Sequence, residues 1–168
     1  MSKIIDSIID KAKKLNKTIV LAEGEEPRTV EAAQTIVSNK IANVVLLGDE
    51  EKLKVMYPQA DFTGIKIVNP LTADIEDYAA TLYELRKAKG MTLDVAKTEI
   101  RKYLNFGAMM IKKGDADGMV AGAINSTGNV LRSGLTIVKT KPGIKTVSSC
   151  FLMAFEGTPY KAQDIMVF

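Results

Sequence analysis

Several residue types that enzyme sites commonly use are missing or almost missing from this sequence. Its 168 residues include no histidine and a single cysteine, Cys150. The chain alone therefore offers no histidine general base, Ser-His-Asp triad or histidine metal site, and no internal disulfide or cysteine-rich zinc site. Tryptophan is absent and aromatic residues make up only 6% of the chain, so stacking on nucleic-acid bases is not indicated.

Long hydrophobic runs and a strong net charge are lacking as well. No apolar stretch approaches the ~20 residues that a membrane-spanning helix needs. Asp6 and Asp10 interrupt the apolar residues near the N-terminus, so this segment does not resemble a signal peptide. The net charge is only +3 and the basic residues are spread along the chain, which disfavours nucleic acid as a partner. We therefore expect a cytoplasmic protein without a membrane partner.

The residues that are present predict an α/β fold. Hydrophobic residues make up 46% of the chain and charged residues 26%, which is enough apolar material for a real core. Helical periodicity is found at 2–15, from residue 27 to 37, and at 50–56, 72–89 and 92–113. Short apolar strands are predicted at 18–22, 43–47, 65–68 and 118–123. This alternation predicts a three-layer αβα domain with a mostly parallel sheet.

The C-terminal part of the sequence suggests a second domain. Residues 146–155 are typical of a strand or buried segment, 156–163 of a loop, and 164–168 of a strand that begins just before the chain stops. Cys150 lies within the first apolar run and is expected to be buried. We interpret 1–145 as the first domain of a two-domain protein and 146–168 as the truncated start of the second. The alternative is a complete protein whose last strand is C-terminal.

Ligands of parallel sheets bind at the carboxyl ends of the strands. The polar loops at 23–29, 69–72 and 124–128 all follow predicted strands, so we expect them to gather on one edge of the sheet. The segment 114–135 is the most informative of these regions. It combines a slim apolar strand, a loop of small polar residues and a helix.

A strand, a small-residue loop and a helix can place backbone N–H groups and hydroxyls around a phosphate. Ser126 and Thr127 lie in that loop, and Arg132 follows just over one turn into the helix, where its guanidinium reaches the same anion. The alternative is that Ser126 and Thr127 only cap the helix. Neither GxGxxG nor GxxxxGK[ST] is present, so no dinucleotide or P-loop fingerprint supports the phosphate interpretation.

Arg86 continues the apolar stripe of the helix predicted at 72–89. A guanidinium on such a face is either an anion ligand or a side chain whose charged end reaches water near the helix terminus. Arg28 has acidic neighbours, Glu25 and Glu26, and a local salt bridge is expected there. Asp115 and Asp117 precede a strand at the edge opposite the expected ligand site, where a turn fits better than a metal site.

Several short motifs, taken together and in this order, resemble the phosphotransacetylase (phosphate acetyltransferase) family. They are EGEEPRT at 23–29, GDADGMV at 114–120 followed by Gly122 and Ala123, Ser126 and Thr127 with Arg132 after them, and TKPG at 140–143 leading to VSS at 147–149. The related phosphate butyryltransferases share part of this pattern, while EGEEPRT and TKPG favour the acetyl enzymes.

The resemblance implies the reaction acetyl phosphate + coenzyme A ⇌ acetyl-CoA + phosphate, part of acetate metabolism. It implies two α/β domains flanking a cleft, direct attack by the CoA thiolate, an aspartate base and a charge-stabilising arginine. It also implies a homodimer, with no metal, and with coenzyme A as a substrate rather than a cofactor.

Residue by residue, Arg86 and Arg132 match arginines implicated in binding CoA or phosphate, and Ser126 and Thr127 match the polar loop at the cleft. The family's catalytic residues come from later in a chain about twice as long. No catalytic residue is therefore assigned here, and the chain by itself is expected to be inactive. The alternatives are a phosphate butyryltransferase or related acyl-CoA enzyme, and a non-catalytic phosphate-binding module.

Overall fold

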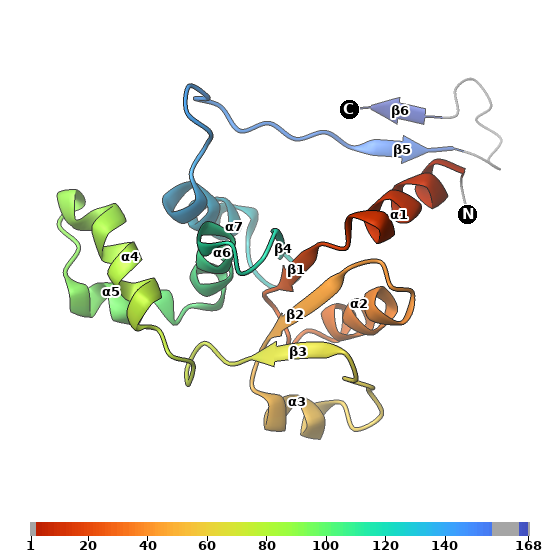
Figure 1. The fold of residues 1–168 in the computed structure, drawn as a ribbon, viewed down its shortest axis with the longest axis horizontal. Helices are drawn as coiled ribbons and strands as arrows, with labels where there is room; N and C mark the ends of the chain where they lie inside the picture. Colours follow the sequence, from red (N-terminus) through yellow and green to blue (C-terminus); the bar gives the residue numbers. More distant parts are fainter. Residues whose placement is uncertain (1–2, 156–164, 168) are drawn as a thin grey trace.

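The centre of the molecule is a four-stranded parallel sheet with helices on both faces (Figure 1). The computed structural model describes residues 3–155 and 165–167. The strand order is β3-β2-β1-β4, so β4 and β3 are the edge strands. The strands are β1 (Thr18–Leu21), β2 (Asn43–Leu47), β3 (Ile65–Val68) and β4 (Gly118–Val120). The expected α/β class and parallel sheet are confirmed.

The helices fill the intervals between these strands. Helix α1 (Lys3–Leu15) precedes β1, α2 (Pro27–Ser38) connects β1 to β2, and α3 (Glu50–Met56) connects β2 to β3. Between β3 and β4 come α4 (Glu76–Arg86), the 3₁₀ turn η1 (Lys87–Lys89), α5 (Leu93–Ile100) and α6 (Tyr103–Lys113). After β4 come α7 (Thr127–Ser133) and the π-helical turn η2 (Gly134–Val138).

The burial pattern of β2 divides the core into two layers. Val44 and Leu46 belong to an apolar cluster with residues of α2 and α3, whereas Val45 and Leu47 belong to a second cluster with residues of α4, α5 and α6. Successive side chains of a strand point to opposite faces, so continuous apolar sequence is what a strand covered on both sides requires. The three-layer arrangement follows from this pattern.

Local sequence signals account for several helix ends. Asp49 accepts a hydrogen bond from the backbone N–H of Lys52 at 3.0 Å and caps the start of α3. Thr92 caps α5 in the same way through Val95. Gly114 ends α6 with φ of 85°, a left-handed conformation that glycine adopts without strain.

Two long helices of the sequence prediction are shorter or divided in the structure. The helix predicted from residue 72 begins at Glu76, because Asn69 and Asp74 bind backbone N–H groups of the turn that precedes it. The helix predicted over 92–113 breaks into α5 and α6 at Lys102, whose backbone is extended. The Asn105 side chain donates to the carbonyl of Glu99 at 2.9 Å, and the same carbonyl accepts the backbone N–H of Lys102 at 3.2 Å.

The C-terminal predictions are partly corrected. Only Leu152–Ala154 of the segment 146–155 forms a strand, β5, which pairs antiparallel with β6 (Ile165–Val167) in a separate two-stranded sheet. Cys150 is exposed rather than buried, because the chain around it has no covering element. The predicted loop at 156–163, Ser2, Asp164 and Phe168 lie outside the described residues. The domain boundary at 145/146 stays a prediction.

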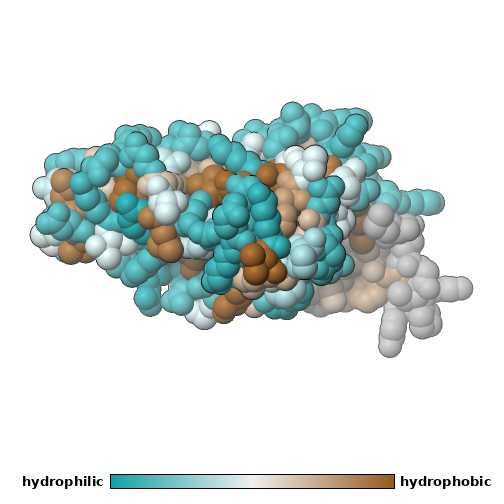
Figure 2. Space-filling view, turned by 90° about the horizontal axis from the view of Figure 1, so that it is seen from below, coloured by the Kyte–Doolittle hydropathy of each residue, from teal (hydrophilic) through white to brown (hydrophobic). Residues whose placement is uncertain are grey.

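Helix α1 differs from the other helices because none of its residues is buried. Its apolar face includes Ile5, Ile8 and Leu15, all of them exposed, and Figure 1 shows the helix projecting away from the main sheet. On the face seen in Figure 2, hydrophilic residues predominate and hydrophobic ones form separate patches. In the described part of the chain, no helix combines the length and apolar character needed to cross a membrane.

Candidate functional site: a cationic cavity beside a carboxylate-bound loop

The loops that follow the parallel strands meet at one edge of the sheet, as predicted. The backbone N–H of Gly24, just after β1, donates to the carbonyl of Leu47 at the end of β2 at 3.1 Å. Asn69, after β3, donates its side-chain amide to Asp49, after β2, at 2.9 Å. The strongest connection joins the end of β1 to the loop after β4, and it is made by Glu23.

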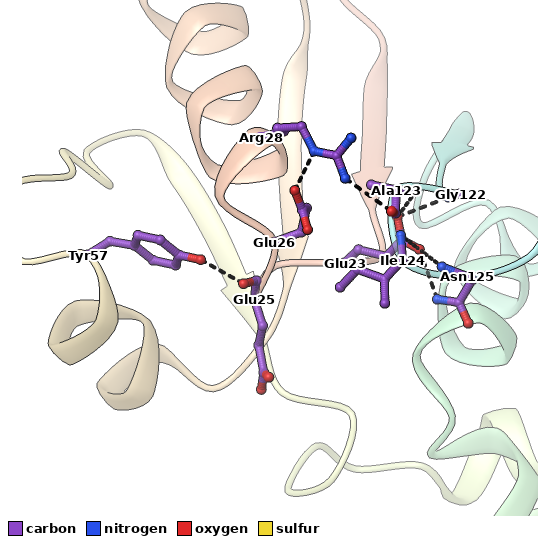
Figure 3. Close-up of polar contacts among 9 residues, drawn as sticks. All are labelled: Glu23, Glu25, Glu26, Arg28, Tyr57, Gly122, Ala123, Ile124 and Asn125. Atoms are coloured by element: carbon purple, nitrogen blue, oxygen red, sulfur yellow. Dashed lines mark hydrogen bonds and ion pairs between the residues drawn. The ribbon is translucent and has the colours of Figure 1, made fainter.

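Glu23 is buried, with only 5% of its surface exposed. One carboxylate oxygen, Oε2, accepts the backbone N–H groups of Gly122 and Ala123 at 2.9 and 2.7 Å. The other oxygen, Oε1, accepts those of Ile124 and Asn125 at 3.1 and 2.8 Å, and the Asn125 side-chain amide at 2.9 Å. Figure 3 shows the loop residues converging on this side chain.

The environment of Glu23 holds its carboxylate in the ionised form. Burial by itself raises the pKa of a carboxyl group, but the hydrogen bonds from Asn125, Ala123 and Ile124 together outweigh burial and lower the pKa of Glu23 from 4.5 to about 2. Glu23 is therefore an acceptor only at neutral pH, and no proton transfer by this residue is expected.

These hydrogen bonds limit which backbone groups at the start of the predicted loop, 124–128, can bind a phosphate. Four successive backbone N–H groups, those of residues 122–125, donate to Glu23 and are not free to bind a phosphate. The five hydrogen bonds to Glu23 do not involve Ser126 or Thr127, whose role in anion binding stays a prediction. The cationic groups, by contrast, lie nearby in an open cavity.

Arg86 and Arg132 line one cavity of about 560 Å³. Arg86 is the last residue of α4 and is half-buried, while Arg132 lies in α7 and is exposed. Within residues 3–155 and 165–167, neither guanidinium has a hydrogen bond or an ion pair with another side chain. The structure thus brings together the two arginines that sequence reasoning singled out 46 positions apart.

The rest of the cavity lining is divided between polar and apolar groups. Lys102 supplies a third cation, and its ammonium is paired with Glu99 at 2.6 Å. The side chains of Asn105, Asn125 and Asn129 also line the cavity. Its apolar lining includes Leu82, Met91, Val95 and Ile137. The cavity thus combines charged and polar groups, including Glu99, with an apolar wall.

Ser126 and Thr127 are placed beside this cavity rather than in its lining, as far as the described residues show. Ser126 is the N-cap of α7, and its hydroxyl accepts the backbone N–H of Asn129 at 3.3 Å. Thr127 is the first residue of the helix. Asn125, directly before this pair, and Asn129, two positions after it, are the residues that reach the cavity.

Residues 3–168 match the family described as Phosphate acetyl/butaryl transferase. The chain belongs to this family. The resemblance found in the sequence motifs is therefore confirmed over almost the whole chain.

Named relatives in the phosphate acetyl/butaryl transferase family are substantially longer than this chain. The phosphate acetyltransferase of Acetivibrio thermocellus is 47% identical over 98% of this chain and 50% of its own length. That of Clostridium acetobutylicum is 42% identical over 98% of this chain and 50% of its own length. A phosphotransacetylase structure from Streptococcus pyogenes matches with a TM-score of 0.85 at 35% identity, over 93% of this chain and 49% of that one. The chain spans about half the length of these relatives.

Asp115 and Asp117 form local structural contacts in this family member. Asp117 accepts hydrogen bonds from the Lys17 ammonium at 2.7 Å and the Thr18 backbone at 2.9 Å, which lowers the pKa of its carboxyl group. Asp115 accepts the hydroxyl of Tyr78. No group of three potential ligands suited to a metal ion occurs among residues 3–155 and 165–167.

Arg28 and Glu26 form the expected local ion pair. The guanidinium of Arg28 also donates to the carbonyl of Ala123 at 3.1 Å, so it too contacts the loop that Glu23 holds (Figure 3).

Sequence reasoning did not single out three residues of this candidate site: Glu23, Asn125 and Asn129. Glu23 was recognised only as part of a polar loop, and its partners lie 99 to 102 positions away. One signal was available for the asparagines, since Asn129 lies one turn before Arg132 in the same helix and Asn125 directly precedes the helix N-cap. An isolated Asn in such a loop is also common as a helix cap, so the signal was not specific.

Proposed function

We propose that this chain provides the coenzyme A-binding half of a phosphate acetyltransferase, with the cavity between α4, α5 and α7 as its binding site. The observation that supports this most directly is that Arg86 and Arg132 line one cavity and form no hydrogen bond or ion pair with a side chain of the described residues. Guanidinium groups match phosphate oxygens in geometry and charge. The polar lining suits the phosphates and amides of CoA, and the apolar wall suits its carbon chain.

The overall reaction we propose is acetyl transfer between acetyl phosphate and CoA. The CoA thiolate attacks the acetyl carbonyl, the C–S bond forms, the C–O bond to phosphate breaks, and inorganic phosphate leaves with the electron pair. No residue of this chain is assigned as the general base. Arg86 and Arg132 bind the substrate, while Ser126 and Thr127 shape the loop beside it. We propose no metal and no cofactor other than CoA as substrate, and a cytoplasmic homodimer for the full-length protein.

Binding of CoA to the chain tests this proposal. Isothermal titration calorimetry is expected to show saturable CoA binding that weakens as salt is raised, because ion pairs with phosphate are screened. Inorganic phosphate alone should bind far more weakly, since it cannot use the apolar wall. Equal affinity for CoA and phosphate would favour a non-catalytic phosphate-binding module, and absence of CoA binding would refute the assignment of the cavity.

A phosphate butyryltransferase remains the second candidate because the family description covers both acyl groups. The relatives named above act as phosphate acetyltransferases by their names, which favours the acetyl group. Rates with acetyl phosphate and butyryl phosphate, measured on a protein of the relatives' length, separate the two.

Removing the Arg132 side chain is expected to weaken CoA binding. Arg132→Ala should raise the Kd for CoA about tenfold, equivalent to about 1.4 kcal/mol, because one charge-assisted contact with phosphate is lost. Calorimetry with CoA measures the effect. Lys112→Ala removes an equally exposed charge from the end of α6 and should leave the Kd unchanged. An unchanged Kd in Arg132→Ala would show that this arginine is an exposed surface residue that does not bind CoA.

Replacing Arg86 separates ligand binding from packing. Arg86→Leu is expected to weaken CoA binding about tenfold, while its free energy of unfolding stays within about 0.5 kcal/mol of the original. Leucine continues the apolar stripe of Ala79 and Leu82, both buried, so the fold should tolerate it. Calorimetry and urea denaturation measure the two quantities. A more stable variant with unchanged CoA affinity would show that Arg86 only packs.

A further inference from the structure

We propose that Glu23 is a positioning residue for the cavity, because its carboxylate holds the loop at 122–125 in the conformation that directs Asn125, Asn129 and Arg132 into the lining. The identity of the ligand rests on the function proposed above. The positioning itself rests only on the contacts of Glu23. Glu23 does not line the cavity, so it acts through the loop and touches no substrate.

The loop has few other anchors. Gly122, Ala123 and Ile124 are exposed, and 62% of the Ile124 surface is accessible to solvent. The short strand before the loop contributes no buried residue. Among the described residues, Arg28 donates to the Ala123 carbonyl, and the backbone N–H groups of this segment all donate to one buried carboxylate, that of Glu23. Packing therefore contributes little to holding the loop in its conformation, and the hydrogen bonds to Glu23 contribute most.

The contacts continue without interruption from Glu23 to the cavity. The Asn125 side chain donates to Glu23 and also forms part of the cavity wall. The next residue, Ser126, caps α7 and accepts the backbone N–H groups of Asn129 at 3.0 Å and Val130 at 3.2 Å through its carbonyl. The helix that follows carries Arg132. A movement of the loop would thus move the asparagines and the arginine together.

The far end of α7 is held independently of Glu23. The buried hydroxyl of Ser133 donates to the carbonyl of Leu104 at 2.8 Å and ties the helix to α6. Loss of the Glu23 contacts should therefore release the loop and the first turn of α7 while the rest of the helix stays docked. We expect a local change in the cavity and not the loss of the domain.

The chemistry of the contact requires a carboxylate. All five hydrogen bonds are donated to Glu23, and both of its oxygens are used. Glutamine presents an oxygen at one end and an NH₂ group at the other, so at least two loop N–H groups would face a donor. Buried donors without acceptors are costly, and the loop would open to water.

Hydrogen exchange tests the positioning without any ligand. In the original chain, the amides of residues 122–125 should exchange slowly for an exposed loop, because each one is hydrogen-bonded. In Glu23→Gln they should exchange about tenfold faster or more and approach the rate of unprotected amides, while the amides of α6 stay protected to the limit set by the global free energy of unfolding. Glu31→Gln, an exposed glutamate of α2, is the matched control. Unchanged exchange at 122–125 in Glu23→Gln would overturn the proposal.

Titration with CoA tests the consequence for the site. Glu23→Ala, which circular dichroism must show to be folded, should bind CoA about tenfold more weakly than the original chain. Formate at tens of millimolar should restore the affinity, because a free carboxylate can occupy the emptied position between the loop N–H groups. Chloride at the same ionic strength should not restore it. A general loss of stability would not respond to formate in this way.

The outcomes distinguish this proposal from the proposed function. If the original chain binds CoA and Glu23→Ala binds it equally well, the positioning role is refuted and the cavity assignment stands. If the original chain does not bind CoA, the cavity assignment fails, and hydrogen exchange with formate decides the positioning role by itself. In Glu23→Ala, faster exchange at 122–125 that formate slows again supports the positioning role, and unchanged exchange or faster exchange that formate does not slow refutes it.

Discussion

Glu23→Gln is expected to lower the free energy of unfolding by about 3 kcal/mol at pH 7, as measured by urea denaturation. The folded-state pKa of Glu23 is about 2, compared with 4.5 when the group is free of these contacts. A depressed pKa stabilises the folded state above the unfolded pKa, and this contribution is lost as the pH falls from 4.5 towards 2. Glutamine carries no such charge, so its variant lacks the contribution at every pH.

The difference in stability between the two proteins therefore depends on pH in a defined direction. It should be largest at neutral pH and shrink through the window between pH 4.5 and about 2. Glu26, Asp61 and Asp117 also have lowered pKa values and destabilise both proteins in acid. Taking the difference between the two proteins removes this shared part. A difference that stays constant from pH 7 to pH 3 would contradict the assigned role of the charge.

Gly24→Ala is expected to destabilise the fold by about 3 kcal/mol. A Cβ atom at this position would lie 2.4 Å from the carbonyl oxygen of Leu47 and 3.2 Å from Cγ of Leu46. The first of these atoms belongs to the backbone of the central strand β2 and cannot move away without disturbing the sheet. The same carbonyl accepts the N–H of Gly24, so that hydrogen bond would be lost with the close approach. Urea denaturation measures the loss.

Gly134→Ala is the matched control for this glycine substitution. Its backbone is helical, with φ of −58° and ψ of −51°, and an added Cβ would meet no atom within 4 Å. Alanine restricts the unfolded chain, so this variant should be more stable by about 0.5 kcal/mol. Opposite signs for the two variants are expected. A loss at Gly24 no larger than the experimental scatter would mean that β1 and β2 can separate at their carboxyl ends.

The parallel sheet could be predicted because its strands are encoded locally. Runs such as Thr18–Leu21 and Asn43–Leu47 are short, apolar on both faces and separated by helical segments. Few fold architectures other than a parallel sheet covered by helices satisfy such a pattern. The same holds for the stripe of Ile75, Ala79 and Leu82, which the structure buries as expected, with Arg86 at its end.

The break between α5 and α6 depends on contacts that periodicity does not contain. The guanidinium of Arg101 donates to backbone carbonyls of Pro70 and Leu71, far away in the sequence, just where the helix is interrupted. Apolar residues on both sides of the break keep a helical spacing, so the pattern predicts one continuous helix. Tertiary hydrogen bonds override that preference.

The sequence predicted the charged residues of the candidate site, but not the contacts that position them. Arginines on an apolar stripe or after a strand are unusual enough to be noticed in a sequence, and both line the cavity. The role of Glu23 is different, because nothing in EGEEPRT distinguishes a buried glutamate that binds a distant loop from the partly buried Glu25 and Glu26. The exposure of Cys150 was mispredicted for a related reason, since an apolar run becomes buried only where another element covers it.

Two carboxylates close opposite ends of the contact between β1 and β4. Asp117 binds Lys17 and the Thr18 backbone where the strands begin, and Glu23 binds the loop where they end. Only three residue pairs lie between these points. If β4 slid by one position, about 3.3 Å, both carboxylates would lose their partners at once and every β4 side chain would change face. The two carboxylates therefore fix the register of β4 on β1. The loop after β4, which forms part of the cavity wall, then starts from one defined position on the sheet.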